Sequence, residues 1–147
     1  MTSLIGNAPV DGVDVAALLG IPISAEQERA VQAPLKPCAV IAGAGTGKTT
    51  VMAARVVWLV ASRLVSPEEI LGLTFTNKAT AELSERIESN LTRVGLLTSE
   101  QPRPTVATYD SFAGTLVNDY GAWDGISTGA HLITCLLYTS DAADDLL

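Results

Sequence analysis

The chain has 147 residues, a formal net charge of −7 at pH 7 and apolar side chains at 48% of its positions. Its length allows one domain but not two, and its apolar content is sufficient for a hydrophobic core. The acidic balance argues against a generally basic nucleic-acid-binding protein, although it permits a local basic track. The two cysteines, Cys38 and Cys135, lack metal-ligand spacing. This usage is typical of the reducing cytoplasm, and Cys38 is expected to pack within a strand.

The N-terminal region does not have the pattern of a secretory signal, because residues 1–14 contain acidic groups and no Lys or Arg. The apolar run 51–61 is too short to span a bilayer and contains Arg55. We therefore expect no membrane contact. Residues 1–22 look like a leader with one weak helical turn over 13–19, and they indicate no function.

The first helix is predicted to begin after Ser24, which is a good N-cap residue. Gln27 follows three residues later, so the two side chains fit a capping box. A functional interpretation of Gln27 is equally open, because its amide offers both a donor and an acceptor and so matches the edge of adenine. The Pro-containing segment 33–37 ends this helix.

A short apolar strand over 37–42, a glycine-rich turn and a helix over 47–64 come next. Gly43, Gly45 and Gly47 allow a tight turn whose backbone N–H groups surround a phosphate, and the helix N-terminus adds partial positive charge. In this strand–loop–helix context the pattern predicts a phosphate-binding P-loop. A glycine-rich turn that binds nothing is the alternative.

The P-loop pattern assigns a role to each of its positions. Lys48 would reach the β- and γ-phosphates, and the Thr49 hydroxyl would hold Mg²⁺, which makes these two the predicted catalytic residues. ATP and Mg²⁺ are the predicted cofactors, with Thr49 as the metal ligand. The predicted nucleotide-binding residues are Gln27, Ala42, Gly43, Ala44, Gly45, Thr46, Gly47, Lys48, Thr49 and Thr50.

Two further strand–helix pairs follow the loop. We expect strands over 70–76 and 105–109, and helices over 77–94 and 111–120. With the first strand and helix, this alternation occurs three times, which predicts an α/β fold with a parallel sheet and flanking helices. The P-loop would lie at the carboxyl end of its strand, where ligands bind in such sheets.

The helix over 77–94 is predicted to be amphipathic. Glu82 and Arg86 are spaced as an i,i+4 ion pair on its wet side, and Gly95 is a suitable C-cap. Its apolar stripe consists of Ala79, Leu83, Ile87 and Leu91.

Four stretches, in this order, resemble the N-terminal end of the UvrD/Rep-type superfamily 1 DNA helicases. Residues 23–31 resemble the Q-motif, whose glutamine reads adenine, and residues 42–49 resemble motif I, where this family often has alanine first. Residues 73–83 resemble motif Ia, and residues 105–113 resemble the next DNA-contacting stretch. The P-loop alone indicates only an NTPase, whereas the Phe-Thr-Asn-Lys-Ala sequence that begins at residue 75 indicates the helicase family.

The resemblance implies an incomplete RecA-like P-loop NTPase fold, in a partial ATP-binding motor domain over 23–134. It implies an ATP-dependent enzyme that translocates 3′ to 5′ on single-stranded DNA and unwinds duplexes. Aromatic residues beyond the strand ends would stack on bases, at about 1–3 kcal/mol per base, and polar groups would contact phosphates. The predicted DNA-binding residues are Phe75, Thr76, Asn77, Lys78, Tyr109, Ser111 and Phe112. For each aromatic residue, a core position is the alternative.

Two positions depart from the family's pattern. Asp110 stands where histidine is frequent. Because an acidic group near a phosphate track weakens binding, we expect Asp110 to point elsewhere. Thr50 stands where some members have an arginine that stacks on adenine, so the base contact would depend more heavily on Gln27. His131 has no partner pattern, and we assign it no role.

The motor is incomplete in this sequence. No apolar run ends in the Asp-Glu pair that holds Mg²⁺ in the family, and no second motor domain supplies arginine fingers. Because phosphoryl transfer depends on positioning and charge stabilisation, we expect the chain alone to bind nucleotide weakly and not to hydrolyse it. The alternatives are another P-loop NTPase, such as a kinase, and a non-catalytic truncated product that binds nucleotide or DNA.

Residues 135–147 form an unusual tail. Their sequence resembles the translation of a widely used transposon-end sequencing adapter, so we expect this segment to be non-native. An ordinary acidic terminus is the alternative.

Overall fold

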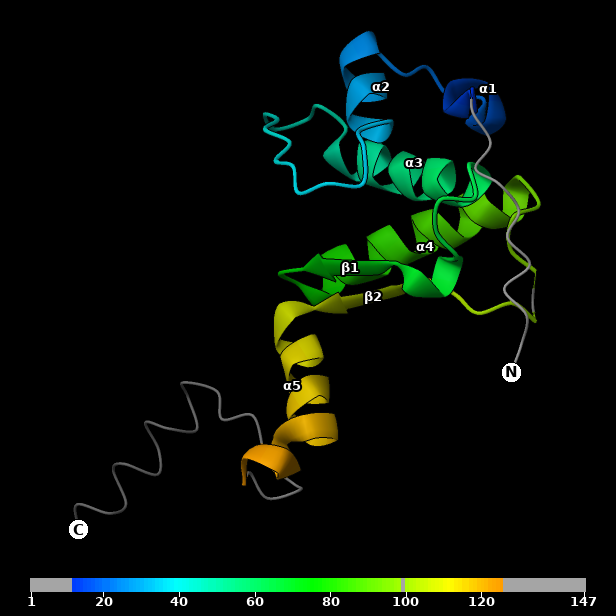
Figure 1. Cartoon of the computed structure of the whole chain (residues 1–147). Coiled ribbons are helices and arrows are strands. Elements are labelled where there is room, and N and C mark those ends of the chain that lie inside the picture. The colour runs from blue at the N-terminus through cyan, green and yellow to red at the C-terminus, as the bar shows by residue number, and fades with distance from the viewer. Residues whose placement is uncertain (1–11, 99, 126–147) are drawn as a thin grey trace. The chain divides into compact units, whose positions relative to one another are not determined.

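A computed structural model describes residues 12–98 and 100–125, and the chain divides into two compact units, residues 1–107 and 108–147. Figure 1 shows the elements of both units. In the first unit they are α1 (Val15–Leu19), α2 (Ala25–Val31), α3 (Lys48–Ala61), η1 (Pro67–Glu69), β1 (Leu71–Thr74), α4 (Asn77–Arg93) and β2 (Thr105–Thr108). The last residue of β2 begins the second unit, which continues with α5 (Tyr109–Tyr120) and η2 (Gly121–Asp124).

Helix α3 is the central element of the first unit. It packs against α1, α2 and α4, and Figure 1 shows it between α2 and α4. Its nearly all-apolar sequence predicts burial on more than one side, and Ala53 and Val57, both fully buried, confirm this. The helix ends at Ala61, three residues earlier than expected, because Arg63 adopts a left-handed conformation with φ of 57°.

Helix α4 presents the predicted apolar stripe to the core. Leu83, Ile87 and Leu91 are at most 3% exposed, and Ala79 is half-buried. Burying one such leucine or isoleucine side chain contributes about 1.5–3 kcal/mol. Strand β1 also packs against α4, so this helix joins the helical layer to the sheet.

The end of α4 confirms the predicted glycine cap. Gly95 has φ of 72°, and its N–H donates to the Thr92 carbonyl at 3.0 Å. The N–H of Leu96 donates to the Leu91 carbonyl at 2.9 Å. These two bonds form a Schellman motif, which requires the left-handed residue that glycine supplies without steric cost.

Strands β1 and β2 form a two-stranded parallel sheet. The N–H of Thr105 donates to the Ile70 carbonyl at 3.0 Å and so fixes their register. This parallel sheet and the helices beside it confirm the predicted α/β class. Both strands are shorter than expected, because Phe75 lies beyond the end of β1 and Tyr109 already belongs to α5.

The prediction of a strand over residues 37–42, all of which the structure describes, is wrong. The segment has no strand assignment, and Val40 and Ile41 are 59% and 98% exposed. A strand persists only where its N–H and C=O groups pair with a neighbour, and neither β1 nor β2 is hydrogen-bonded to this segment. The expectation that Cys38 packs within a strand is wrong for the same reason, since Cys38 is exposed.

Helix α1 lies within the segment expected to be a leader, over the predicted turn, and it contributes to the core. Val15 and Leu19 are buried, and α1 packs on α3. The guanidinium of Arg93 donates from Nη2 to the Leu19 carbonyl at 2.8 Å, which satisfies the carboxyl end of this short helix. The predicted non-native tail over 135–147, Cys135 and His131 all lie outside the described residues.

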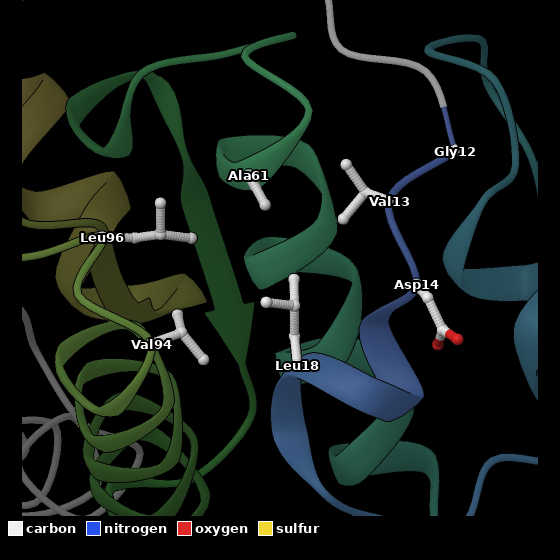
Figure 2. A pocket seen from close by; sticks show the side chains of 7 residues that line it. All are labelled: Gly12, Val13, Asp14, Leu18, Ala61, Val94 and Leu96. Carbon is white, nitrogen blue, oxygen red and sulfur yellow. The ribbon is translucent and has the colours of Figure 1, made fainter.

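A pocket of about 400 Å³ lies between the start of α1, the end of α3 and the turn after α4. Figure 2 shows Val13 and Leu18 facing it from the α1 side, with Ala61, Val94 and Leu96 opposite. None of the residues predicted to bind nucleotide or DNA lines it. Among the described helices, none has both the length and the apolar character needed to cross a membrane.

Candidate functional site

The glycine-rich loop before α3 has the backbone that phosphate binding requires. Gly45 and Gly47 have φ of 73° and 80°, values at which a side chain is strained. The Thr46 hydroxyl donates to the Gly43 carbonyl at 2.9 Å and closes the turn. Gly47 is the N-cap of α3, and no side chain caps this helix. The backbone N–H groups of the first turn of α3 are therefore available to an anion.

Lys48 folds back over the loop that precedes it. Its Nζ donates to the Ala42 carbonyl at 3.3 Å and to the Gly43 carbonyl at 2.6 Å. The side chain is exposed, and the half-buried Thr49 follows it in the first turn of α3. An ammonium group, free N–H groups and a hydroxyl thus meet at one helix end, and this donor set suits a polyphosphate with its Mg²⁺.

Gln27 joins the amino end of α2 to the glycine-rich loop. Its Oε1 accepts from the Ser24 N–H at 2.9 Å, and its own N–H donates to the Ser24 hydroxyl at 3.2 Å, so the predicted capping box is confirmed. Its Nε2 also donates to the Thr46 carbonyl at 3.1 Å. A Cβ at Gly47 would lie 3.3 Å from this Nε2, so glycine lets the amide approach closely. The structural and functional interpretations of Gln27 are therefore compatible.

Arg86 of α4 reaches the same end of α3. Its Nη1 donates to the Thr50 hydroxyl at 2.8 Å, which brings a second cation to the start of the helix. The predicted ion pair between Glu82 and Arg86 is therefore wrong, and Glu82 instead lies 3.9 Å from Lys78. Sequence reasoning missed this contact because residues 50 and 86 come from different helices, and helical spacing carries no signal for such a pair.

The predicted DNA-binding residues of the first unit lie where β1 passes into α4. Phe75 is 88% exposed, and Asn77 and Lys78 are exposed in the first turn of α4. The Thr76 hydroxyl accepts from the Ala79 N–H at 3.1 Å, so it caps α4 in the described structure. The exposed aromatic face, the lysine and the helix N-terminus form a chemically suitable surface for a nucleic-acid backbone.

The remaining predicted DNA-binding residues lie in the second unit, at the start of α5. Tyr109 is 48% exposed, Ser111 is exposed and Phe112 is half-buried. The N–H of Ser111 donates to the Thr108 hydroxyl at 3.1 Å, which caps the helix. Asp110 is exposed in the first helical turn, where a negative charge is favourable to the helix dipole. This placement gives Asp110 a local structural role.

Comparison with known proteins identifies close sequence relatives. The model of the UvrD/REP helicase N-terminal domain matches residues 23–144. A probable DNA helicase II homolog of Rickettsia conorii is 37% identical over 97 residues, which cover 66% of this chain and 14% of that protein. The ATP-dependent DNA helicase PcrA of Bacillus subtilis is 48% identical over 65 residues, which cover 44% of this chain and 9% of that protein.

DNA helicase II of Escherichia coli is 45% identical over 75 residues, which cover 51% of this chain and 10% of that protein. The matched part of the chain thus covers 9–14% of the length of these relatives.

Proposed function

The chain belongs to the UvrD/REP helicase N-terminal domain family, and on that premise we propose that it is the ATP-binding portion of an ATP-dependent DNA helicase. In the whole protein, ATP hydrolysis would be coupled to 3′-to-5′ translocation on single-stranded DNA and to unwinding in the cytoplasm. The observation that carries the proposal is the convergence of Lys48, Gln27 and the uncapped start of α3 on one glycine-rich loop. We propose that this loop is a P-loop and that it belongs to a RecA-like fold.

Binding of ATP would exchange the internal contacts of the loop for contacts with phosphate. The Lys48 ammonium leaves the carbonyls of Ala42 and Gly43 and pairs with phosphate oxygens, and the N–H groups of the first turn of α3 donate to the same group. The Thr49 hydroxyl is the proposed Mg²⁺ ligand. Bound Mg²⁺ would supply charge neutralisation on the phosphates. The residue set proposed for the nucleotide is the one predicted from the sequence.

Single-stranded DNA is the proposed partner of the exposed residues that follow each strand. Phe75 and Tyr109 supply aromatic surface for stacking, and Thr76, Asn77, Lys78 and Ser111 supply polar or charged contacts to the backbone. Phe112 is half-buried, and its proposed role is to support the start of α5 within the second unit.

The chain by itself is proposed to bind without turnover. Its sequence lacks an apolar run that ends in Asp-Glu, and the described residues contain no cluster of three acidic, His or Cys side chains suited to a metal ion. Affinity for nucleotide would come from the glycine-rich loop, the first turn of α3 with Lys48 and Thr49, Gln27 and Arg86.

The proposal is tested by titrating the chain with a fluorescent ATP analogue in the presence of Mg²⁺, alongside the Lys48→Ala variant. Lys48 is exposed, so the variant is expected to fold with a change of about 0.5 kcal/mol or less in the free energy of unfolding. We expect binding by the wild-type chain and at least a tenfold loss in the variant. Equal affinity in the two proteins would refute a working nucleotide site.

A further inference from the structure

Arg55 of α3 makes four hydrogen bonds to backbone carbonyls outside its own helix. Its Nη1 donates to Ala30 at 3.3 Å, to Val31 at 2.9 Å and to Ala33 at 2.7 Å. Its Nη2 donates to Pro34 at 3.4 Å. The acceptors are the last carbonyls of α2 and those of the turn that follows. No other side chain in the described part of the chain makes as many such contacts with a distant segment.

These contacts satisfy the carboxyl end of α2. The last carbonyls of a helix lack partners within the helix, and a cation at this end interacts favourably with the helix dipole. Helix α2 has only seven residues, too few for an isolated helix to be stable in water. Its placement therefore depends on tertiary anchors, which at its carboxyl end are Arg55 and the buried side chain of Val31.

The two ends of α2 are attached to the same structural element. At the amino end, Gln27 donates to the Thr46 carbonyl in the loop that opens α3. At the carboxyl end, Arg55 holds α2 from a position seven residues after Lys48, which is about two turns along α3. The helix that carries the P-loop lysine thus also fixes the helix that carries Gln27.

We propose that Arg55 is a positioning residue for recognition of the nucleotide base. By anchoring the carboxyl end of α2 to α3, Arg55 holds the Gln27 amide in place beside the P-loop, so that the site distinguishes adenine from other groups attached to a triphosphate. The inference rests on the proposed nucleotide-binding function. Arg55 makes no hydrogen bond to the glycine-rich loop over residues 43–47 in the described structure, so its effect on binding passes through Gln27 and not through the phosphates.

The first test compares ATP with inorganic tripolyphosphate as ligands of the full 147-residue chain, by isothermal titration calorimetry in Mg²⁺. The Arg55→Met variant keeps most of the apolar stem and removes the donors. We expect its affinity for ATP to fall about tenfold, a common size for coupling between linked residues. Its affinity for tripolyphosphate should stay within twofold of the wild-type value. Arg55→Lys keeps the charge and some donors, so its ATP affinity should lie between those of Arg55→Met and the wild-type chain.

Two controls separate positioning from general damage. Arg29 is an exposed arginine in the last turn of α2 with no side-chain hydrogen bond in the described structure, so Arg29→Met should leave both affinities unchanged. In a Gln27→Ala background, Arg55→Met should cause no further loss of ATP affinity, because Gln27 is the group that it positions. Equal losses for ATP and tripolyphosphate, or additive losses in the double variant, would overturn the proposal.

A second measurement does not require nucleotide. Hydrogen–deuterium exchange should be about tenfold faster in α2 of Arg55→Met than in the wild-type chain, with exchange in α4 unchanged. If the wild-type chain bound neither ATP nor tripolyphosphate, the proposed function would fail for this chain. Unchanged protection of α2 in Arg55→Met would then overturn the anchoring independently, whereas faster exchange would support it.

Discussion

Replacing Gln27 by glutamate separates two roles that the wild-type amide performs together. The Oε1 atom accepts from the Ser24 N–H, and the Nε2 atom donates to the Thr46 carbonyl. Glutamate keeps an acceptor for the helix cap and has no donor for the loop. Alanine removes both contacts, so the pair of variants distinguishes the stability of α2 from the attachment of α2 to the glycine-rich loop.

The expected stability changes follow from these contacts. Each of the two hydrogen bonds contributes about 0.5–1.5 kcal/mol, and partial exposure of Gln27 favours the lower part of that range. Alanine recovers a few tenths of a kcal/mol in helix propensity. Gln27→Ala should therefore reduce the free energy of unfolding by about 1 kcal/mol. In Gln27→Glu the cap is retained and a carboxylate in the first turn is favourable, so its change should be about 0.5 kcal/mol or less.

For ATP affinity we expect the opposite order, with Gln27→Glu at least as damaging as Gln27→Ala. Gln27→Glu places a negative charge beside the phosphate loop and offers no N–H to Thr46 or to a base. Its ATP affinity should fall at least as far as that of Gln27→Ala, by about tenfold or more. Urea unfolding and titration with a fluorescent ATP analogue measure the two quantities. If Gln27→Glu bound ATP as tightly as the wild-type chain, Gln27 would be a helix cap only, and the reasoning would be refuted.

Leu91 is fully buried on α4, so Leu91→Ala should lower the free energy of unfolding in urea by about 2–5 kcal/mol. Leu18→Ala, at a partly exposed position, should lower it by about 1 kcal/mol or less. Similar losses at both sites would contradict the described core. Phe75→Ala should weaken binding of a single-stranded oligonucleotide by about 1–3 kcal/mol in an anisotropy titration, because the exposed ring is the proposed stacking surface. Unaltered affinity would exclude stacking on Phe75. Gly47→Ala should lower ATP affinity more than Gly45→Ala, because of these two only the new Cβ at Gly47 would lie within 4 Å of the Gln27 amide. Equal losses of affinity would show that backbone strain alone is responsible.

Local sequence signals predicted the helices well. The Ser24–Gln27 capping box, the apolar stripe of α4 and the glycine cap at Gly95 depend on residues a few positions apart, so spacing alone identifies them. The family resemblance was confirmed by comparison. The glycine-rich loop is predictable because its positive φ angles favour glycine, and glycine stands at those positions in the sequence.

Contacts between distant segments were not predictable in the same way. Helical spacing predicts an ion pair between Arg86 and Glu82 on the same helix, whereas the Arg86 guanidinium reaches Thr50 on another helix. In the sequence Arg55 only interrupts an apolar run, whereas in the structure its guanidinium binds the carboxyl end of α2. Both side chains are long enough to leave their own helix, and their partners are backbone or hydroxyl oxygens that leave no pattern in the sequence.

The exposed segment before the glycine-rich loop affects how the chain behaves in concentrated solution. Val40 and Ile41 are largely exposed in a stretch rich in strand-forming residues, and such a stretch is a template for intermolecular β-pairing. Pro37 and the glycines after Ala42 flank it and limit the length of backbone that a second copy can pair with. The segment that precedes the glycine-rich loop is thus also open to β-pairing with a second copy, and a charged substitution at Ile41 would oppose such pairing.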